Sequence, residues 1–203
     1  MISLDEIDEF ILREYESAQK LTYHVDEMRS KLTQFFIALS GVAFAATSAL
    51  LNKDIASLLF GVPWWVVASF ITFLCAVLGS LFVLIIAKLR RTQIEHFHIT
   101  NNIRQYFLDK SDNADELWRV VALSHETIPK PTRSSGSYYW VLLIIILTSL
   151  FFAIFAYLLS ANLTESETGK YLCAGFFLFF TIFVLDRLYI DKATFVAKIQ
   201  QSV

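Results

Sequence analysis

The sequence predicts an all-α membrane protein with four transmembrane helices and with both termini in the cytoplasm. The first observation is a set of apolar runs without a single charged residue: 34–51, 62–87, 139–161 and 171–185. A helix needs about 20 mostly apolar residues to cross the hydrocarbon core, and three of the runs reach or nearly reach that length unaided. The second observation is composition, because 56% of the chain is hydrophobic and only 18% is charged. An average soluble domain is less apolar and more charged.

The third observation is the distribution of basic residues. Of 17 Lys and Arg, only Lys53 and Lys170 lie in the loops that follow the first and third runs. Because Lys and Arg accumulate in cytoplasmic loops, we expect the N-terminal segment, the connection 88–138 and the C-terminal tail 191–203 in the cytoplasm. The two short loops would then face outward.

The segment 1–33 is expected to form a cytoplasmic amphipathic helix that continues into the first span, because no Pro or Gly interrupts it. Its apolar residues recur every seven positions, with a second series beside the first: Leu4, Ile11, Ala18, Val25 and Leu32, then Ile7, Leu21 and Met28. Such a repeat gives a helix one apolar seam. The seam would pack either on the chain's own cytoplasmic connection or against copies of itself.

The first span, 34–51, presents a face of small and polar residues. Its members advance by four and three positions in turn, which places them on one side of a helix: Gln34, Ala38, Gly41, Ala45, Ser48 and Asn52. In lipid, helices associate through close packing of small residues and through hydrogen bonds between polar side chains. The face is therefore either a helix contact within one subunit or the lining of a water-filled axis shared by several subunits.

The other spans differ from the first. The second, 62–87, carries small residues that we expect to pack against the face of the first span: Ser69, Thr72, Ala76 and Gly79. The third span, 139–161, is rich in Leu and Ile, and the fourth, 171–190, carries five phenylalanines between 176 and 183. Bulky apolar helices of this kind suit lipid contact. Asp186 and Arg187 would anchor the cytoplasmic end of the fourth helix.

The cytoplasmic connection 88–138 predicts a helix that continues the second span to residue 110 and a second helix from Asn113. The candidate contacts for an anionic ligand or lipid are basic and aromatic residues: Lys88, Arg90, Arg91, Arg104, Tyr106 and Trp118. Bases near the end of a span usually meet anionic lipid headgroups. The alternative is a site for a nucleotide, an oligonucleotide or an acidic protein, in which aromatic rings stack on bases and arginines hold phosphates.

No catalytic constellation is apparent, so we expect that the protein is not an enzyme and needs no cofactor. Within the apolar runs the polar residues are hydroxyls and an amide near a helix end, whereas catalysis requires clustered acids, bases or nucleophiles. His96 and His98 are two positions apart and would point to opposite sides of a helix, so they do not predict a metal site.

In this layout a cytoplasmic helix enters a small-residue span, and a basic connection joins the second and third spans. The layout resembles small multi-span membrane effectors of bacterial antiphage defence. The systems similar in outline are Hailong, cyclic-oligonucleotide signalling systems and the membrane subunit of Kiwa. The resemblance implies an oligomeric channel or membrane disruptor in the bacterial inner membrane, controlled by a cytosolic nucleotide ligand or partner protein. A tetramer is the working assumption for the homo-oligomer. The alternative function is a non-conducting membrane anchor or sensor that docks a soluble partner protein.

Overall fold

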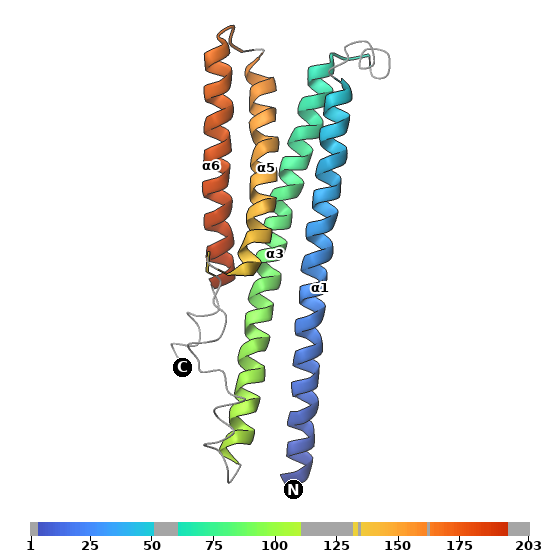
Figure 1. Ribbon diagram of the computed structural model, residues 1–203, viewed down its shortest axis with the longest axis vertical. Coiled ribbons are helices and arrows are strands. Elements are labelled where there is room, and N and C mark those ends of the chain that lie inside the picture. The colour runs from blue at the N-terminus through green and yellow to red at the C-terminus, as the bar shows by residue number, and fades with distance from the viewer. Residues whose placement is uncertain (1–3, 51–60, 111–131, 134, 162, 195–203) are drawn as a thin grey trace. The chain divides into compact units, whose positions relative to one another are not determined.

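A computed structural model describes residues 4–50, 61–110, 132–133, 135–161 and 163–194 (Figure 1). Within these ranges the regular structure is entirely helical, without a strand. The four helices are α1 (Leu4–Leu50), α3 (Trp64–Asp109), α5 (Gly136–Ser160) and α6 (Glu167–Thr194). Each is long and apolar enough to cross a membrane. The predicted all-α class with four candidate spans is thus confirmed, and the chain is a multi-pass membrane protein.

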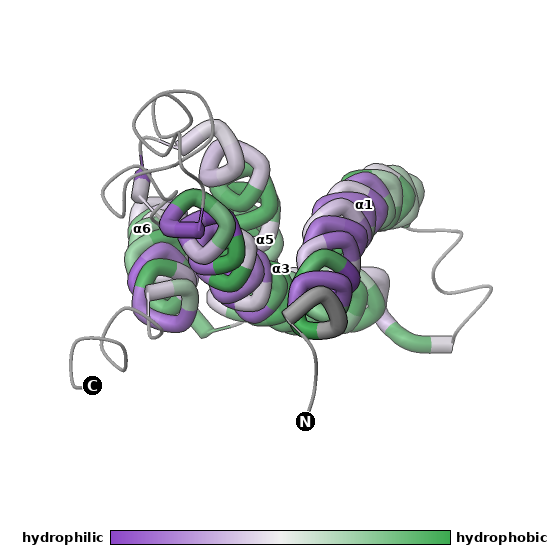
Figure 2. The backbone as a smooth tube through the Cα atoms, turned by 90° about the horizontal axis from the view of Figure 1, so that it is seen from below, coloured by the Kyte–Doolittle hydropathy of each residue, from purple (hydrophilic) through white to green (hydrophobic). Residues whose placement is uncertain are grey.

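Helices α1 and α3 are much longer than a bilayer requires. They contain 47 and 46 residues, whereas about 20 suffice for the hydrocarbon core. α1 runs without a break from the predicted amphipathic segment into the first span, and α3 continues the second span to Asp109. Figure 2 shows the change in composition along α1, where hydrophilic positions dominate near the N-terminal end and hydrophobic ones farther along.

The chain divides into two compact units, which we describe separately. The membrane bundle comprises Lys31–Ala87 and Thr132–Lys192, and the polar unit comprises Met1–Ser30, Lys88–Pro131 and Ala193–Val203. Both units receive part of α1 and part of α3. The helix predicted from Asn113 lies outside the described residues.

In the membrane bundle, α3 packs against both α1 and α5 at small residues. Gly79 is fully enclosed, because a Cβ atom added there would lie 2.1 Å from Thr148 Oγ1 and 2.7 Å from Phe36 Cζ. One turn away, Cys75 and Ala76 form a buried cluster with Ala43 of α1 and Phe151 of α5. A second cluster joins Leu50, Ala68 and Leu158. Small residues on α3 therefore allow the three helices to approach closely, as expected in lipid.

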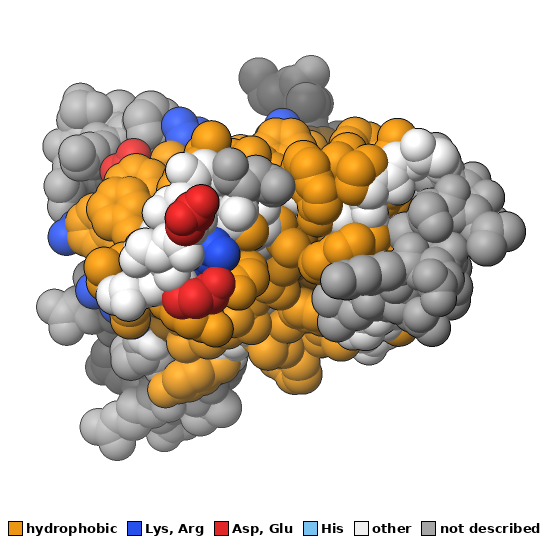
Figure 3. Space-filling model, turned by 90° about the horizontal axis from the view of Figure 1, so that it is seen from above, with side chains coloured by type: hydrophobic (Ala, Val, Ile, Leu, Met, Phe, Trp, Pro, Cys, Tyr) orange, Lys and Arg blue, Asp and Glu red, His pale blue; other side chains and the backbone are white. Residues whose placement is uncertain are grey.

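The third and fourth spans are packed to different extents. In α6 the bulky aromatic residues are exposed, as predicted for lipid contact: Phe176, Phe177, Phe179, Phe180 and Phe183. The expectation of a lipid-facing third span was wrong for one of its sides, since Ile144, Ile145 and Phe151 are completely buried. Leu and Ile do not by themselves distinguish lipid contact from helix contact, because both surroundings are apolar. The surface seen from above is largely hydrophobic, with a small group of charged side chains (Figure 3).

Candidate functional site

The predicted small and polar face of α1 is exposed. Gln34, Ala38, Gly41, Ala45 and Ser48 all lie on the surface of the structure, and Asn52 lies outside the described residues. A Cβ atom added at Gly41 would have no neighbour within 4 Å. None of the five described residues belongs to the buried core of the membrane bundle.

The bundle instead uses a neighbouring face of α1, which corrects the expected pairing of α1 with α3. Its buried members are Thr33, Phe36, Ser40, Ala43 and Leu50. The first four advance by three and four positions in turn, and Leu50 follows seven positions after Ala43. The predicted small face of α3 is buried throughout: Ser69, Thr72, Ala76 and Gly79. The physical reason is complementarity, because two small surfaces would leave voids, whereas Phe36 fills the space that Gly79 leaves.

In the polar unit, the seam of α1 includes Ala18 and Val25 from the first predicted apolar series, with Ile11 half-buried, but not the second series. Ala18 and Val25 are buried, whereas Ile7, Leu21 and Met28 are each about two fifths exposed. The positions that share the buried side are polar: Asp8, Tyr15, Thr22 and Arg29. The spacing of hydrophobic residues alone does not reveal this seam, because most of its members are polar. The signal was present, since these four residues also recur every seven positions.

The polar seam is built from hydrogen bonds between α1 and α3. The Arg104 guanidinium donates to the Tyr15 hydroxyl at 3.1 and 3.3 Å. The two buried residues Arg29 and Arg90 both donate to Oε1 of Gln93, at 3.0 and 2.6 Å. A neutral amide oxygen thus accepts from two cationic groups at once. Arg29 also forms an ion pair with Asp26 at 2.9 Å.

The predicted ligand contacts are mostly part of this seam and do not form one shared surface. Lys88 is exposed, but Arg90 is buried and Arg104 binds Tyr15. Tyr106 donates to Asp8 at 3.2 Å, and Lys110 forms an ion pair with the same carboxylate. Arg91 pairs with Glu95 at 3.2 Å on its own helix. Trp118 lies outside the described residues.

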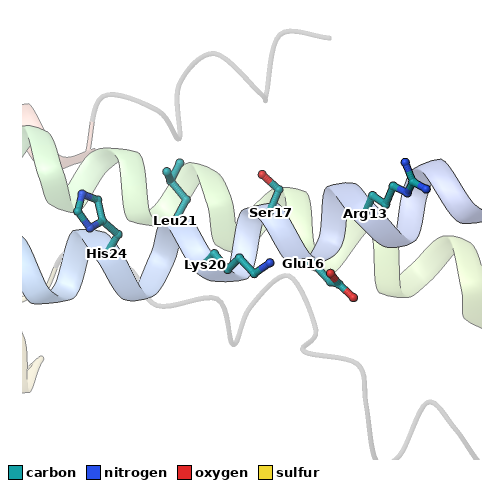
Figure 4. Close-up of a pocket in the computed structure, with 6 residues that line it drawn as sticks. All are labelled: Arg13, Glu16, Ser17, Lys20, Leu21 and His24. Carbon is teal, nitrogen blue, oxygen red and sulfur yellow. The ribbon is translucent and has the colours of Figure 1, made fainter.

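A shallow hollow lies along α1 in the polar unit (Figure 4). It is lined by residues of this one helix: Arg13, Glu16, Ser17, Lys20, Leu21 and His24. Their side chains point in different directions along the helix instead of converging on one point. Arg13 is already paired with Glu9 at 2.6 Å. The hollow therefore does not assemble the converging groups that a binding or catalytic site requires.

Metal-binding chemistry has no candidate in the described part of the chain. No group of three or more His, Cys, Asp or Glu side chains is placed to hold an ion there. The two cysteines, Cys75 and Cys173, are both free thiols on different helices of the bundle.

The fold and the exposed face define the class of protein. It is a multi-pass helical membrane protein in which a small and polar face of α1 is exposed. The comparisons add no family to this class. No family model, curated protein or solved structure matches the chain.

Proposed function

We propose that the protein is an oligomeric membrane effector that forms or gates an ion-conducting pore. In this proposal, the face of Gln34, Ala38, Gly41, Ala45 and Ser48 meets the same face of other subunits around a water-filled axis. A cytosolic ligand or partner protein controls conduction through the connection between α3 and α5. Each subunit lies in the bacterial inner membrane with both termini in the cytoplasm, as the distribution of Lys and Arg favours.

The observation that carries the proposal is the exposure of this face beside a fully packed one. Gln34 and Ser48 carry hydrogen-bonding groups, and polar groups in a membrane usually face a protein interior or a water-filled cavity. The chain's own described helices bury the other side of α1, through Phe36, Ala43 and Leu50. A second subunit or an aqueous axis would provide surroundings that lipid cannot provide for the Ser48 hydroxyl.

The proposal includes a role in antiphage defence. It rests on the layout of a long polar helix, a small-residue span and a polar inter-span connection. Growth arrest after expression with the genes that flank this one would test the role. Normal growth of phage-infected and uninfected cells alike would remove it.

The proposed conduction is tested by ion flux into liposomes that contain the purified protein. Replacement of Gly41 or Ala45 by Leu adds bulk to the open face, and we expect either change to alter flux at least severalfold. Val42→Leu is the matched control, because Val42 is exposed on the same helix but does not belong to the face. Equal flux in all four proteins would remove the pore assignment.

The second candidate function, a non-conducting anchor or sensor, is favoured by a different observation. Large apolar side chains are exposed on α1 in the polar unit, among them Phe10, Leu12 and Leu21. Exposed apolar residues outside the membrane indicate a surface that a protein partner covers. Recovery of one stoichiometric soluble partner with the wild-type protein, its loss in Phe10→Ser, and the absence of flux would favour this function over the pore.

A further inference from the structure

The burial of α6 is confined to the second half of this helix. Its buried residues all lie between 181 and 193: Thr181, Leu185, Asp186, Tyr189 and Ala193. No residue between Glu167 and Phe180 is buried. Near its start, α6 contacts α5 through the exposed Tyr171, whose ring lies 5.5 Å from that of Tyr157. The buried contacts of α6 are those around Asp186.

Asp186 lies inside the helix and not at its end, and it binds two groups from outside α6. The Tyr138 hydroxyl, at the start of α5, donates to Oδ1 at 2.6 Å. The Arg133 guanidinium donates to Oδ2 and completes an ion pair. The rings of Tyr138 and Tyr189 also pack against each other, with centroids 6.1 Å apart and planes tilted by 48°, and both residues are buried. A carboxylate thus sits at the centre of the contact between α5 and α6.

The two members of the ion pair have different surroundings. The Asp186 side chain is 12% exposed, whereas the Arg133 side chain is 61% exposed. The carboxylate raises the pKa of Arg133 above its ordinary value, through the hydrogen bond and the opposite charge. Arg133 belongs to the stretch that joins α3 to α5, close to the first turn of α5. The exposed Arg133 side chain can therefore move away from the ion pair, whereas the buried Asp186 side chain cannot.

Departure of Arg133 would leave a buried negative charge with the neutral Tyr138 hydroxyl as its hydrogen-bond donor and the exposed Arg187 as a more distant cation. Removal of one partner from a buried ion pair is costly, because the remaining charge has lost both its counter-ion and water. The bundle can avoid this cost by moving Asp186 toward water. That movement requires displacement of α6, because the carboxylate is carried by that helix.

We propose that the Arg133–Asp186 ion pair is a latch that couples the stretch between α3 and α5 to the position of α6. A ligand or partner that draws Arg133 away from Asp186 allows α6 to move. When Arg133 is bound to Asp186, α6 stays in place. Only the identity of the signal rests on the proposed function. The latch itself exists whether or not the protein conducts ions.

The latch is tested by hydrogen exchange of the full-length protein in lipid nanodiscs. In Arg133→Gln we expect exchange of the amides between 181 and 193 to accelerate about tenfold, with little change in α1 and α3. The variant Asp186→Asn should have a smaller effect, because a neutral amide does not need a counter-ion. The double variant R133Q/D186N should resemble Asp186→Asn, since the two changes remove the same interaction.

The matched control is Arg187→Gln, which removes the adjacent cation. Arg187 is exposed and its guanidinium lies 5.5 Å from the centre of the Phe183 ring, outside the ion pair. Arg187 favours the Asp186 carboxylate through its charge alone, so exchange between 181 and 193 should accelerate far less in this variant than in Arg133→Gln. Two results would overturn the latch: unchanged exchange in Arg133→Gln, or effects of Arg133→Gln and Asp186→Asn that simply add in the double variant. Liposome flux plays no part in either result, so failure of the latch is distinguishable from failure of the pore.

Discussion

The membrane bundle and the polar unit use the same two helices in opposite ways. In the bundle, α1 and α3 meet through close packing of small and large side chains, as at Gly79 and Phe36. In the polar unit they meet through charged and polar groups, as at Arg104 and Tyr15. The difference shows which kind of interaction joins the two helices in each unit. Lipid gives no hydrophobic drive for helix association, so the bundle depends on shape, whereas a helix pair in water could have used an apolar core.

The polar unit has no extensive apolar core among its described residues. Its buried apolar side chains are few among the described residues: Ala18, Val25, Ile94, Leu108 and Ala193. Between them lie buried polar side chains, including Gln93 and Asn101. Both polar atoms of the Asn101 amide are buried without a hydrogen-bond partner. The comparison therefore indicates that the polar unit is the less stable of the two and the first to open.

The largest expected effect is a loss of stability when the close packing around Gly79 is disrupted. Gly79→Val would place carbon atoms where Thr148 and Phe36 already lie, and overpacking of this severity costs about 3 kcal/mol or more. Unfolding in mixed micelles measures the effect. The control is Gly41→Val, where the added atoms meet nothing within 4 Å. Equal stability of the two variants would show that close packing does not hold α1, α3 and α5 together.

A change of opposite sign is expected in the polar unit. Asn101→Leu replaces a buried amide without partners by an apolar side chain of similar size, and should stabilise the protein by roughly 1–3 kcal/mol. The neighbouring Asn102 is exposed, so Asn102→Leu should have little effect on the midpoint of thermal unfolding. A loss of stability in Asn101→Leu would indicate that the amide does find a partner and that this seam is better satisfied than described.

A smaller effect is expected from the hydrogen bond between the two helices of the polar unit. Tyr15→Phe removes the acceptor of Arg104 and should cost about 1 kcal/mol. Tyr23→Phe is the control, because Tyr23 is 73% exposed. Proteolysis of the polar unit by dilute trypsin should accelerate in the first variant alone. Equal rates for both variants would contradict the assigned role of Tyr15.

The smallest expected effect is a pH dependence at the N-terminal end of the polar unit. The hydrogen bond from Lys110 lowers the pKa of Asp8 below its ordinary value of 3.8. A carboxyl with a lowered pKa in the folded state stabilises the protein above its ordinary pKa, and this contribution is lost as the pH falls through the lower value. The difference in melting temperature between the wild type and Asp8→Asn should therefore be present at neutral pH and shrink below about pH 4. A difference that grows in acid would contradict the assignment.

Much of the fold could be predicted from the sequence, because uninterrupted apolar runs specify spanning helices almost alone. The length of α1 followed from the absence of Pro and Gly between residues 1 and 33. Which sides of the helices meet could not be predicted, since lipid and protein interiors are equally apolar. For this reason the predicted contact of α1 with α3 lies on the wrong face of α1, and the buried side of α5 was not predicted.

The candidate site was less accessible to sequence reasoning. The spacing of Gln34, Gly41 and Ser48 defined a face, but whether that face is open depends on Phe36 fitting over Gly79. The partners of Asp186 could not be anticipated either. Arg133 is 53 positions away from Asp186 in the chain, and no spacing rule connects them.

The central claim is that the exposed face of α1 borders water in the assembled protein. Single cysteines at Ala38, Ala45 and Ser48, in a protein with Cys75 and Cys173 replaced, would be treated in intact proteoliposomes with a charged thiol reagent. The account predicts fast modification at these three positions and slow modification at Ala43, which is buried, and at Val42, which is exposed beside the face. Modification that is equally slow at Ala38, Ala45, Ser48 and Val42 would place the face in lipid or in a dry contact and contradict the account.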